Sequence, residues 1–289
     1  MAVSAQQVKE LRDKTGAGMI DCKKALEDSN GDLEVAIDIL RKKGAAVAAK
    51  RAERAANEGV VLTKIFDDGK SAVMIEVNCE TDFVAKNEDF ASFANLALEA
   101  VITNQPADVE ALMTLSVNGK NLSDELNSLI GKIGEKIQVS RFTIEKADNG
   151  VIVDYIHHGS KLGVLISAEN IQGDKAAEFT PILKDFAMQV AAMRPISVYR
   201  EEVDKTLIEK EMEIYKELAR KEGKPEQILE KIAAGKLNKY YEENCLFEQA
   251  FVKDNSKKVS TLIEEFNQKH ATKAKLIQFK RFHLSDEKK

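Results

Sequence analysis

Few residues in this chain could carry covalent chemistry, and Cys79 is the most suggestive of them. It follows the apolar run 72–77 and comes just before a helix start that the sequence favours, a position that can lower the pKa of a thiol. Its neighbours Glu80 and Asp82 are acidic, however, and nearby negative charge raises the pKa of a thiol. A thiol enzyme that uses Cys79 is therefore the weaker hypothesis.

Patterns for binding metals or phosphates are missing from the sequence. His157 and His158 are adjacent, so their side chains fall on opposite faces of a strand and cannot serve as ligands of one ion. The cysteines and histidines do not show zinc-site spacing. Gly119-Lys120 lacks the glycine-rich context and the following Ser or Thr of a phosphate loop. We expect no cofactor, no metal and no catalysis by this chain.

Binding chemistry is better represented, around Phe83. The apolar run 72–77 predicts a buried strand that the polar residues 78–81 interrupt. Thr81 is placed to begin a short helical turn, with Asp82 near its positive end. The large ring of Phe83 follows directly. It is either part of the core or an exposed group that could fill a pocket on another protein.

The composition is that of a folded protein without a strong preference for nucleic acid or membrane. The 289 residues are enough for two cores, or for one core with appendages, and the shares of hydrophobic (44%) and charged (31%) residues are ordinary for a globular protein. Since 43 Lys+Arg face 48 Asp+Glu, the net charge is −5, and a mildly acidic chain binds phosphates poorly. The sequence predicts neither an apolar membrane-spanning run nor a signal peptide, and its three scattered cysteines indicate reduced thiols. We expect a cytoplasmic protein that contacts neither nucleic acid directly nor a membrane.

Residues 4–44 predict a compact module of three helices. Ser4 and Gln7 have the spacing of a capping box at the first helix. Asp32 is placed to cap the third helix, which Gly44 is expected to end.

Met19 and Ile20, which follow the glycine break at 16–18, have two interpretations. They are either buried in the small core of this module or form an exposed apolar docking patch. Residues 45–56 predict a helical linker, whose basic side chains are expected to face solvent rather than phosphates: Lys50, Arg51 and Arg54.

Residues 59–146 predict a mixed unit of strands and helices. The expected segments are strands at 59–66, 71–77 and 137–144, a hairpin turn at 67–69, and helices that begin at Asn87 and span 123–133. The helix after Asn87 carries an apolar stripe that is expected in the core: Phe90, Phe93, Leu96, Ala97 and Val101. For residues 113–117 the sequence does not distinguish a helix from a loop.

The same pattern then recurs. Strands are predicted at 150–156, 162–167 and 277–284, and a helix carries the stripe Phe179, Leu183, Phe186 and Val190. The closing strands 137–144 and 277–284 share Ile, Gln, Arg and Phe in register. Each copy is expected to form a three-stranded antiparallel sheet with helices on one side.

A helical arm interrupts the second copy. The segment 201–222 carries a short coiled-coil seam of Ile208, Met212, Tyr215 and Ala219. Pro225 suits the first turn of a second helix, whose facing stripe is Ile228, Leu229, Ile232 and Tyr240. The arm either packs only on itself or serves docking or dimerisation.

The predicted fold class is α+β. The expected divisions are a three-helix module with linker at 1–55, a first α/β subdomain at 56–146, a second α/β subdomain at 147–198 and 246–289, and a helical hairpin at 199–245.

Two motifs resemble a known family. The stretch 76–87, Glu-Val-Asn-Cys-Glu-Thr-Asp-Phe-Val-Ala-Lys-Asn, is similar to the signature of bacterial-type translation elongation factor Ts. The stretch 11–26, Leu-Arg-Asp-Lys-Thr-Gly-Ala-Gly-Met-Ile-Asp-Cys-Lys-Lys-Ala-Leu, resembles the family's N-terminal motif, although Ile20 is often methionine in relatives. The layout of the whole chain matches as well.

The resemblance implies a guanine-nucleotide exchange factor for the GTPase elongation factor Tu. It implies that Phe83, with Asp82 beside it in the motif Thr81-Asp82-Phe83-Val84, enters a gap between two helices of the GTPase domain. Moving those helices would disturb the magnesium site that holds GDP. No bond is made or broken, which agrees with the missing catalytic patterns.

The resemblance also implies further contacts. The N-terminal module would be ubiquitin-associated-like and would touch the GTPase through Met19 and Ile20. Ile133 and Gly134 match a loop that presses on the nucleotide-binding side of the partner, although Ile133 could equally be core. His158 and Gly159, at the second hairpin turn, match a contact to a β-domain of the GTPase; a solvated turn is the alternative. The arm would be a coiled coil, used for self-association in some members.

Three hypotheses therefore compete: an exchange factor, an adaptor that binds peptides or ubiquitin-like partners through the three-helix module, and a thiol enzyme. The long duplicated region argues against an adaptor, since a small module would suffice for that task.

Overall fold

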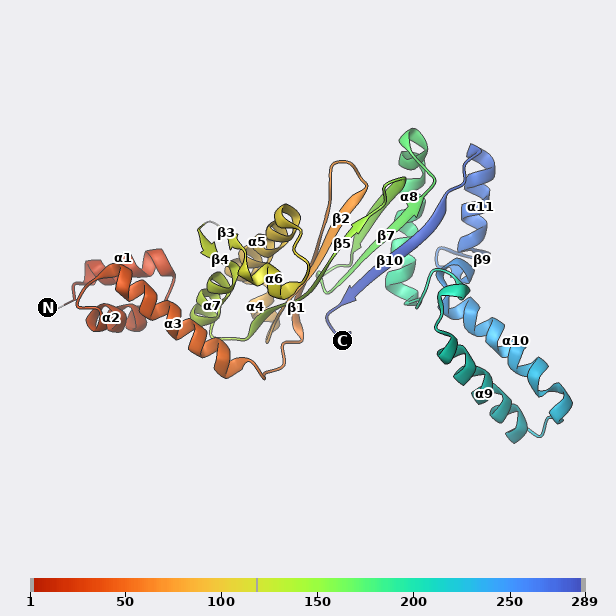
Figure 1. The fold of residues 1–289 in the computed structure, drawn as a ribbon, viewed down its shortest axis with the longest axis horizontal. Helices are drawn as coiled ribbons and strands as arrows, with labels where there is room; N and C mark the ends of the chain where they lie inside the picture. The colour runs from red at the N-terminus through yellow and green to blue at the C-terminus, as the bar shows by residue number, and fades with distance from the viewer. Residues whose placement is uncertain (1–2, 118, 287–289) are drawn as a thin grey trace.

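A computed structural model describes residues 3–117 and 119–286. Met1 and Ala2, which belong to the N-terminal stretch without a predicted signal peptide, lie outside the described residues. The chain is an α+β protein with small antiparallel sheets. Three helices lie at one end, two three-stranded sheets with their helices form the centre, and a helical hairpin projects from the other end (Figure 1).

The N-terminal helices are α1 (Ala5–Thr15), α2 (Met19–Asp28) and α3 (Leu33–Arg51). The predicted capping box of Ser4 and Gln7 is present, and Asp32 accepts hydrogen bonds at the start of α3, as predicted. The core of the module is small and consists of Leu11, Cys22, Ala25, Leu26 and Ala36.

The prediction that Gly44 ends the third helix is wrong. Helix α3 continues to Arg51, so the expected linker is largely part of it. Gly44 lies where α3 crosses α7, and a Cβ there would come within 2.4 Å of the carbonyl oxygen of Asn127. Glycine at this position permits close helix packing instead of chain reversal.

The first sheet has the order β1-β2-β5 and is built from β1 (Glu58–Ile65), β2 (Ser71–Cys79) and β5 (Ile137–Lys146). The expected interruption at 78–81 begins later than predicted, because Asn78 pairs with Gly59 and Gln138 inside the sheet. The helices of this unit are α4 (Asp82–Ala85), α5 (Glu88–Asn104), α6 (Val109–Thr114) and α7 (Leu122–Ile133).

Asn87 caps α5 as predicted, and Phe90, Phe93, Ala97 and Val101 are buried under the sheet. Residues 113–117, left open by the sequence, end α6 and begin the small hairpin of β3 (Ser116–Val117) and β4 (Lys120–Asn121).

The second sheet has the order β10-β7-β6, formed by β6 (Gly150–Ile156), β7 (Leu162–Glu169) and β10 (Lys275–His283). In both sheets the second strand of the hairpin is central, with the first hairpin strand on one side and the closing strand on the other. Helices α8 (Gly173–Met193) and α11 (Val259–His270) cover it, and the stripe Phe179, Leu183, Phe186 and Val190 is buried. The sequence did not predict the short hairpin of β8 (Ala250–Phe251) and β9 (Asp254–Lys258).

The two sheets pack face to face between their helices (Figure 1). Their shared core contains Val61, Ala72, Met74, Ala147, Ile152, Leu165, Phe282 and Leu284. Gly163 permits the close approach, since a Cβ there would lie 2.6 Å from Cγ1 of Val61.

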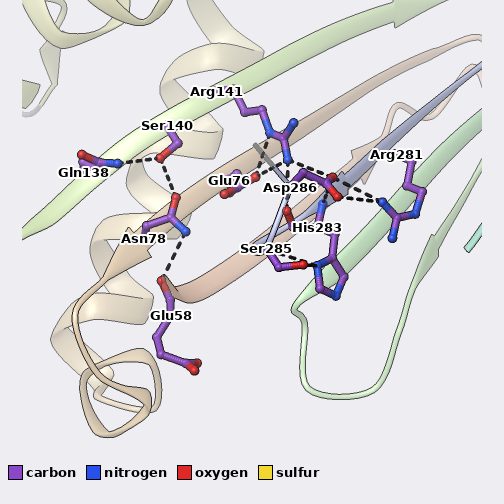
Figure 2. Close-up of polar contacts among 10 residues, drawn as sticks. All are labelled: Glu58, Glu76, Asn78, Gln138, Ser140, Arg141, Arg281, His283, Ser285 and Asp286. Carbon is purple, nitrogen blue, oxygen red and sulfur yellow. Dashed lines mark hydrogen bonds and ion pairs between the residues drawn. The ribbon is translucent and has the colours of Figure 1, made fainter. Parts of the chain in front are cut away.

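A polar cluster joins the sheets at one edge (Figure 2). Arg141 on β5 donates to Glu76 on β2 at 2.8 Å and to the carbonyl oxygen of His283 at 3.2 Å. Asp286 accepts from Arg281 at 3.0 Å and lies 3.4 Å from Arg141. The segment after β10 is thereby tied to the first sheet.

The arm consists of α9 (Lys205–Lys221) and α10 (Glu226–Asn244), flanked by short 3-10 helices at Arg200–Glu202 and Leu246–Glu248. Ala219, Leu229 and Ala233 are buried in its seam. The assignment of Ile228 to this seam is wrong, because its side chain is 41% exposed, and Ala233 takes the inward place. Pro225 directly precedes α10 instead of lying in its first turn.

Candidate functional site

The four-residue helix α4 presents the ring of Phe83 to solvent. Thr81 caps the helix by accepting a hydrogen bond from the backbone N–H of Val84 at 3.4 Å, as the sequence predicted. Val84 is buried in the core of the first unit, whereas Phe83 is 81% exposed. The two interpretations of Phe83 are thus resolved toward an outward position.

Asp82 and Lys86 form an ion pair beside this ring. Nζ of Lys86 donates to Asp82 at 2.8 Å, one helical turn away. This hydrogen bond lowers the pKa of Asp82 and raises that of Lys86. The surface around the ring therefore carries a pair of opposite charges, and the carboxylate stays ionised at neutral pH.

The start of α4 is held by two carboxylates. Glu135 accepts hydrogen bonds from the Thr81 backbone N–H at 3.1 Å and from the Thr81 hydroxyl at 2.9 Å. Glu80 accepts from the Lys136 backbone N–H at 2.6 Å. Its burial alone would raise the pKa of Glu80, but the hydrogen bonds from Lys136, Arg54 and Arg51 outweigh that effect and lower it.

The prediction that the linker's basic residues face solvent holds for Lys50 and Arg54, which are exposed, and is wrong for Arg51, whose side chain is 25% exposed. Arg51 lies 3.3 Å and Arg54 3.1 Å from the carboxylate of Glu80. Lys136 also donates to the backbone carbonyls of Ala52 and Arg54. The sequence analysis did not predict these contacts. The available signal was the position of two acidic residues: Glu80 directly precedes the expected contact segment 81–84, and Glu135 directly follows 133–134.

Cys79 is buried, and burial together with the charges of Glu135 and Glu58 raises its pKa to about 12. The expected contribution of Asp82 is present but small. A thiol that is protonated at neutral pH and sealed in the core is a poor nucleophile. In residues 3–117 and 119–286, no group of three or more His, Cys, Asp or Glu is arranged to hold a metal ion.

Ile133 and Gly134 lie at the end of α7, next to the residues that hold α4. Ile133 is half-buried against the core of the first unit, so its position has features of both interpretations. Gly134 caps the helix with a φ of 79°, which favours glycine. A Cβ at Gly134 would lie 3.9 Å from Nη2 of Arg51.

The second hairpin turn also comes close to this region. His158 and Gly159 are exposed in the turn. The neighbouring Ser160 accepts a hydrogen bond from the backbone of Val61 at 2.6 Å, and Lys161 pairs with Glu58 at 2.6 Å. The structure thus brings 81–84, 133–134 and 158–159 to the same part of the molecule.

Met19 and Ile20 begin α2, directly after the glycine break, on the side of the module where a Cβ at Gly16 would lie 3.0 Å from Nζ of Lys132 on α7. Their side chains are 62% and 84% exposed, which favours the docking patch over the buried alternative. They border a shallow groove of about 630 Å³ that Val8, Lys9 and Arg12 also line.

Exposed apolar side chains on separate elements, one of them beside an ion pair, are typical of a protein-binding surface. None of the described helices combines the length and apolar character needed to cross a bilayer.

Comparison with known proteins defines the class further. A family model described as "Elongation factor TS" matches residues 80–286. Proteins named elongation factor Ts from Prosthecochloris aestuarii and Chlorobaculum parvum are each 46% identical over 286 residues, which cover 98% of this chain and 98% of each relative. The protein of that name from Chlorobaculum tepidum is 47% identical over the same length, with 98% of both chains covered. The chain belongs to the elongation factor Ts family and is a translation elongation factor, which acts in protein biosynthesis.

Proposed function

We propose that this chain is a guanine-nucleotide exchange factor for elongation factor Tu, acting in the cytoplasm. The observation that carries the proposal is the 81% exposure of Phe83 on the short helix α4. A large apolar ring held in solvent is costly unless another protein covers it. The family and the motif around Phe83 support the choice of partner.

In the proposed mechanism, Phe83 enters a gap between two helices of the GTPase domain and Asp82 lies beside it. Burial of one such side chain contributes about 1.5–3 kcal/mol. If that contact forms only when the nucleotide is absent, linkage requires the nucleotide's affinity to fall by the same factor, about ten- to hundredfold. The displaced helices would disturb the site that holds magnesium and GDP, and no covalent step is needed.

Other contacts would share the task. Thr81 and Val84 fix the turn that carries the ring, and Ile133 with Gly134 lies beside it. We assign further contacts to the turn at His158 and Gly159, and to Met19 and Ile20 on the N-terminal module, which we take to be ubiquitin-associated-like. The chain itself is proposed to need no cofactor and to act on the partner's magnesium–GDP complex.

The arm is the proposed site of self-association. Leu207, Ile214 and Leu218 on α9 are 36%, 48% and 43% exposed and lie outside the seam with α10. Their spacing of seven and four residues places them on one face of the helix. A second copy of the arm could cover that face.

We also interpret the two sheets, with their matching strand order, as a duplicated subdomain whose second copy this coiled-coil arm interrupts.

The test of the proposed function is release of fluorescent GDP from elongation factor Tu, followed by stopped flow. We expect addition of the chain to accelerate release strongly and in a saturable manner. An unchanged release rate at saturating concentration would contradict exchange activity. An adaptor that binds only through the N-terminal module would bind the GTPase or another protein without this acceleration.

A further inference from the structure

The turn that carries Phe83 is too short to hold its own conformation. Helix α4 has four residues, and a helix of that length does not form by itself in water. Its buried anchor is Val84, and its N-terminal cap bond from Val84 to Thr81 is long, at 3.4 Å. The direction of the ring must therefore depend on contacts from elsewhere in the chain.

Those contacts form a reciprocal pair between two dipeptides, Glu80-Thr81 and Glu135-Lys136. Glu80 accepts from the backbone N–H of Lys136, and Glu135 accepts from the backbone N–H of Thr81. Glu135 also accepts from the Thr81 hydroxyl at 2.9 Å. Each dipeptide thus contributes one carboxylate and one backbone donor, and charged acceptors make such bonds short and strong.

The same junction reaches the N-terminal module. Arg51 ends α3 and lies 3.3 Å from Glu80, and Arg54, three residues further on, lies 3.1 Å from it. Lys136 donates to the backbone of Ala52 at 2.7 Å and of Arg54 at 2.9 Å. Helix α3 has 19 residues and is roughly 28 Å long, so the contacts at its C-terminal end also help to orient the N-terminal module.

We propose that Glu135 and Glu80 are positioning residues for exchange: they hold the Phe83 turn in its docking direction and join it to the 133–134 loop and to α3. Neither carboxylate needs to touch the partner, because both are occupied by groups of this chain. The inference rests on the proposed exchange function and deepens it. A ring displaced by about 1 Å loses a large part of its effect, so loss of Glu135 is expected to slow exchange about ten- to hundredfold.

The decisive experiment is a double-mutant cycle on GDP release from elongation factor Tu, using the full chain. Glu135→Ala should lower the maximal rate. If it acts through the ring, the variant with both Glu135→Ala and Phe83→Ala should be no slower than Phe83→Ala alone. Glu135→Gln keeps one acceptor oxygen and should fall between Glu135→Ala and the unmodified chain. Glu265→Ala on α11 removes an exposed ion pair with Lys257 on β9; this variant is the matched control and should leave the rate unchanged.

Hydrogen exchange supplies a readout that does not depend on the partner. Glu135→Ala should speed exchange of the amides at 81–86 and leave those of β7 unchanged. Three outcomes would each overturn the proposal. The amides at 81–86 could exchange at an unaltered rate in Glu135→Ala, or this variant could release GDP as fast as the unmodified chain does. The losses in GDP-release rate from the two single substitutions could also multiply in the double variant. If the unmodified chain itself fails to accelerate GDP release, the exchange function falls, and the amide exchange still decides whether Glu135 holds the turn. Should Glu135→Ala not fold, the same comparisons are made with Glu135→Gln.

Discussion

At the scale of single residues, the site depends on the different exposure of the neighbours Phe83 and Val84. The two apolar neighbours differ in exposure: Phe83 faces solvent, and Val84 takes the core position. Thr81 and Glu135 fix the backbone before them, and Lys86 holds Asp82 beside the ring. The exposed ring is consequently available to a partner without any rearrangement of the core.

Cys79→Ser separates binding from thiol chemistry. We expect the rate of GDP release to stay within about twofold, because the thiol is buried and protonated at neutral pH. Stability should fall by about 1–3 kcal/mol, since a hydroxyl replaces a sulfur in an apolar core. Stopped-flow rates and urea unfolding measure the two effects. A variant that is fully folded but has lost its exchange activity would revive the enzyme hypothesis.

The sequence predicted the position of the motif and the cap at Thr81 but not the direction of the ring. Periodicity cannot separate two adjacent apolar residues in a four-residue helix. It also could not pair Arg51 and Arg54 with Glu80, because these partners are 29 and 26 positions apart and belong to different elements.

At the scale of elements, helix α3 acts as a rigid connection because nothing ends it at Gly44. Its glycine faces Gly131 of α7, where a Cβ would lie 3.1 Å from Cα of Gly44. Two glycines at a helix crossing permit close contact between backbones. Glycine is typical both of a helix end and of a helix crossing. The sequence analysis predicted a helix end at Gly44, whereas the structure has a crossing there.

The exposed face of α9 leads to a prediction about the arm. Ile214→Glu places a charge in the middle of the face formed with Leu207 and Leu218 and should abolish self-association through it. Light scattering after gel filtration measures the mass of both proteins across a concentration series. Lys210→Glu, also on α9, serves as the control and should leave the mass as it is in the unmodified chain. An Ile214→Glu chain that associates as strongly as the unmodified one would exclude this face.

At the scale of the whole molecule, two sheets share one core between their outer helices. Strand β2 is buried along nearly its whole length because α5 covers one face and the second sheet covers the other. The continuous apolar run in the sequence predicted burial of this strand. It could not identify the covering sheet, since that contact joins parts of the chain separated by about one hundred residues.

Asp286 gives this assembly a dependence on pH. Partial burial alone would raise its pKa, but the hydrogen bond from Arg281 and the charges of Arg281 and Arg141 outweigh it and keep the pKa below 3.8. The stabilisation is therefore complete above pH 3.8 and is lost as the pH falls through the lower folded-state value. Asp286→Asn should cost about 1–3 kcal/mol at pH 7, and this difference should shrink below pH 3.8. Urea unfolding at a series of pH values checks the trend, and an equal difference at all pH values would contradict it.

The most direct test of the account is the maximal rate of GDP release from elongation factor Tu with Phe83→Ala. The ring is exposed, so its removal should leave the melting temperature unchanged while the rate falls about ten- to hundredfold. Met193→Ala removes a side chain that is 50% exposed at the end of α8 and should keep the unmodified rate. A Phe83→Ala chain that accelerates release as well as the unmodified chain, at the same saturating concentration, would contradict the claim that this ring drives exchange.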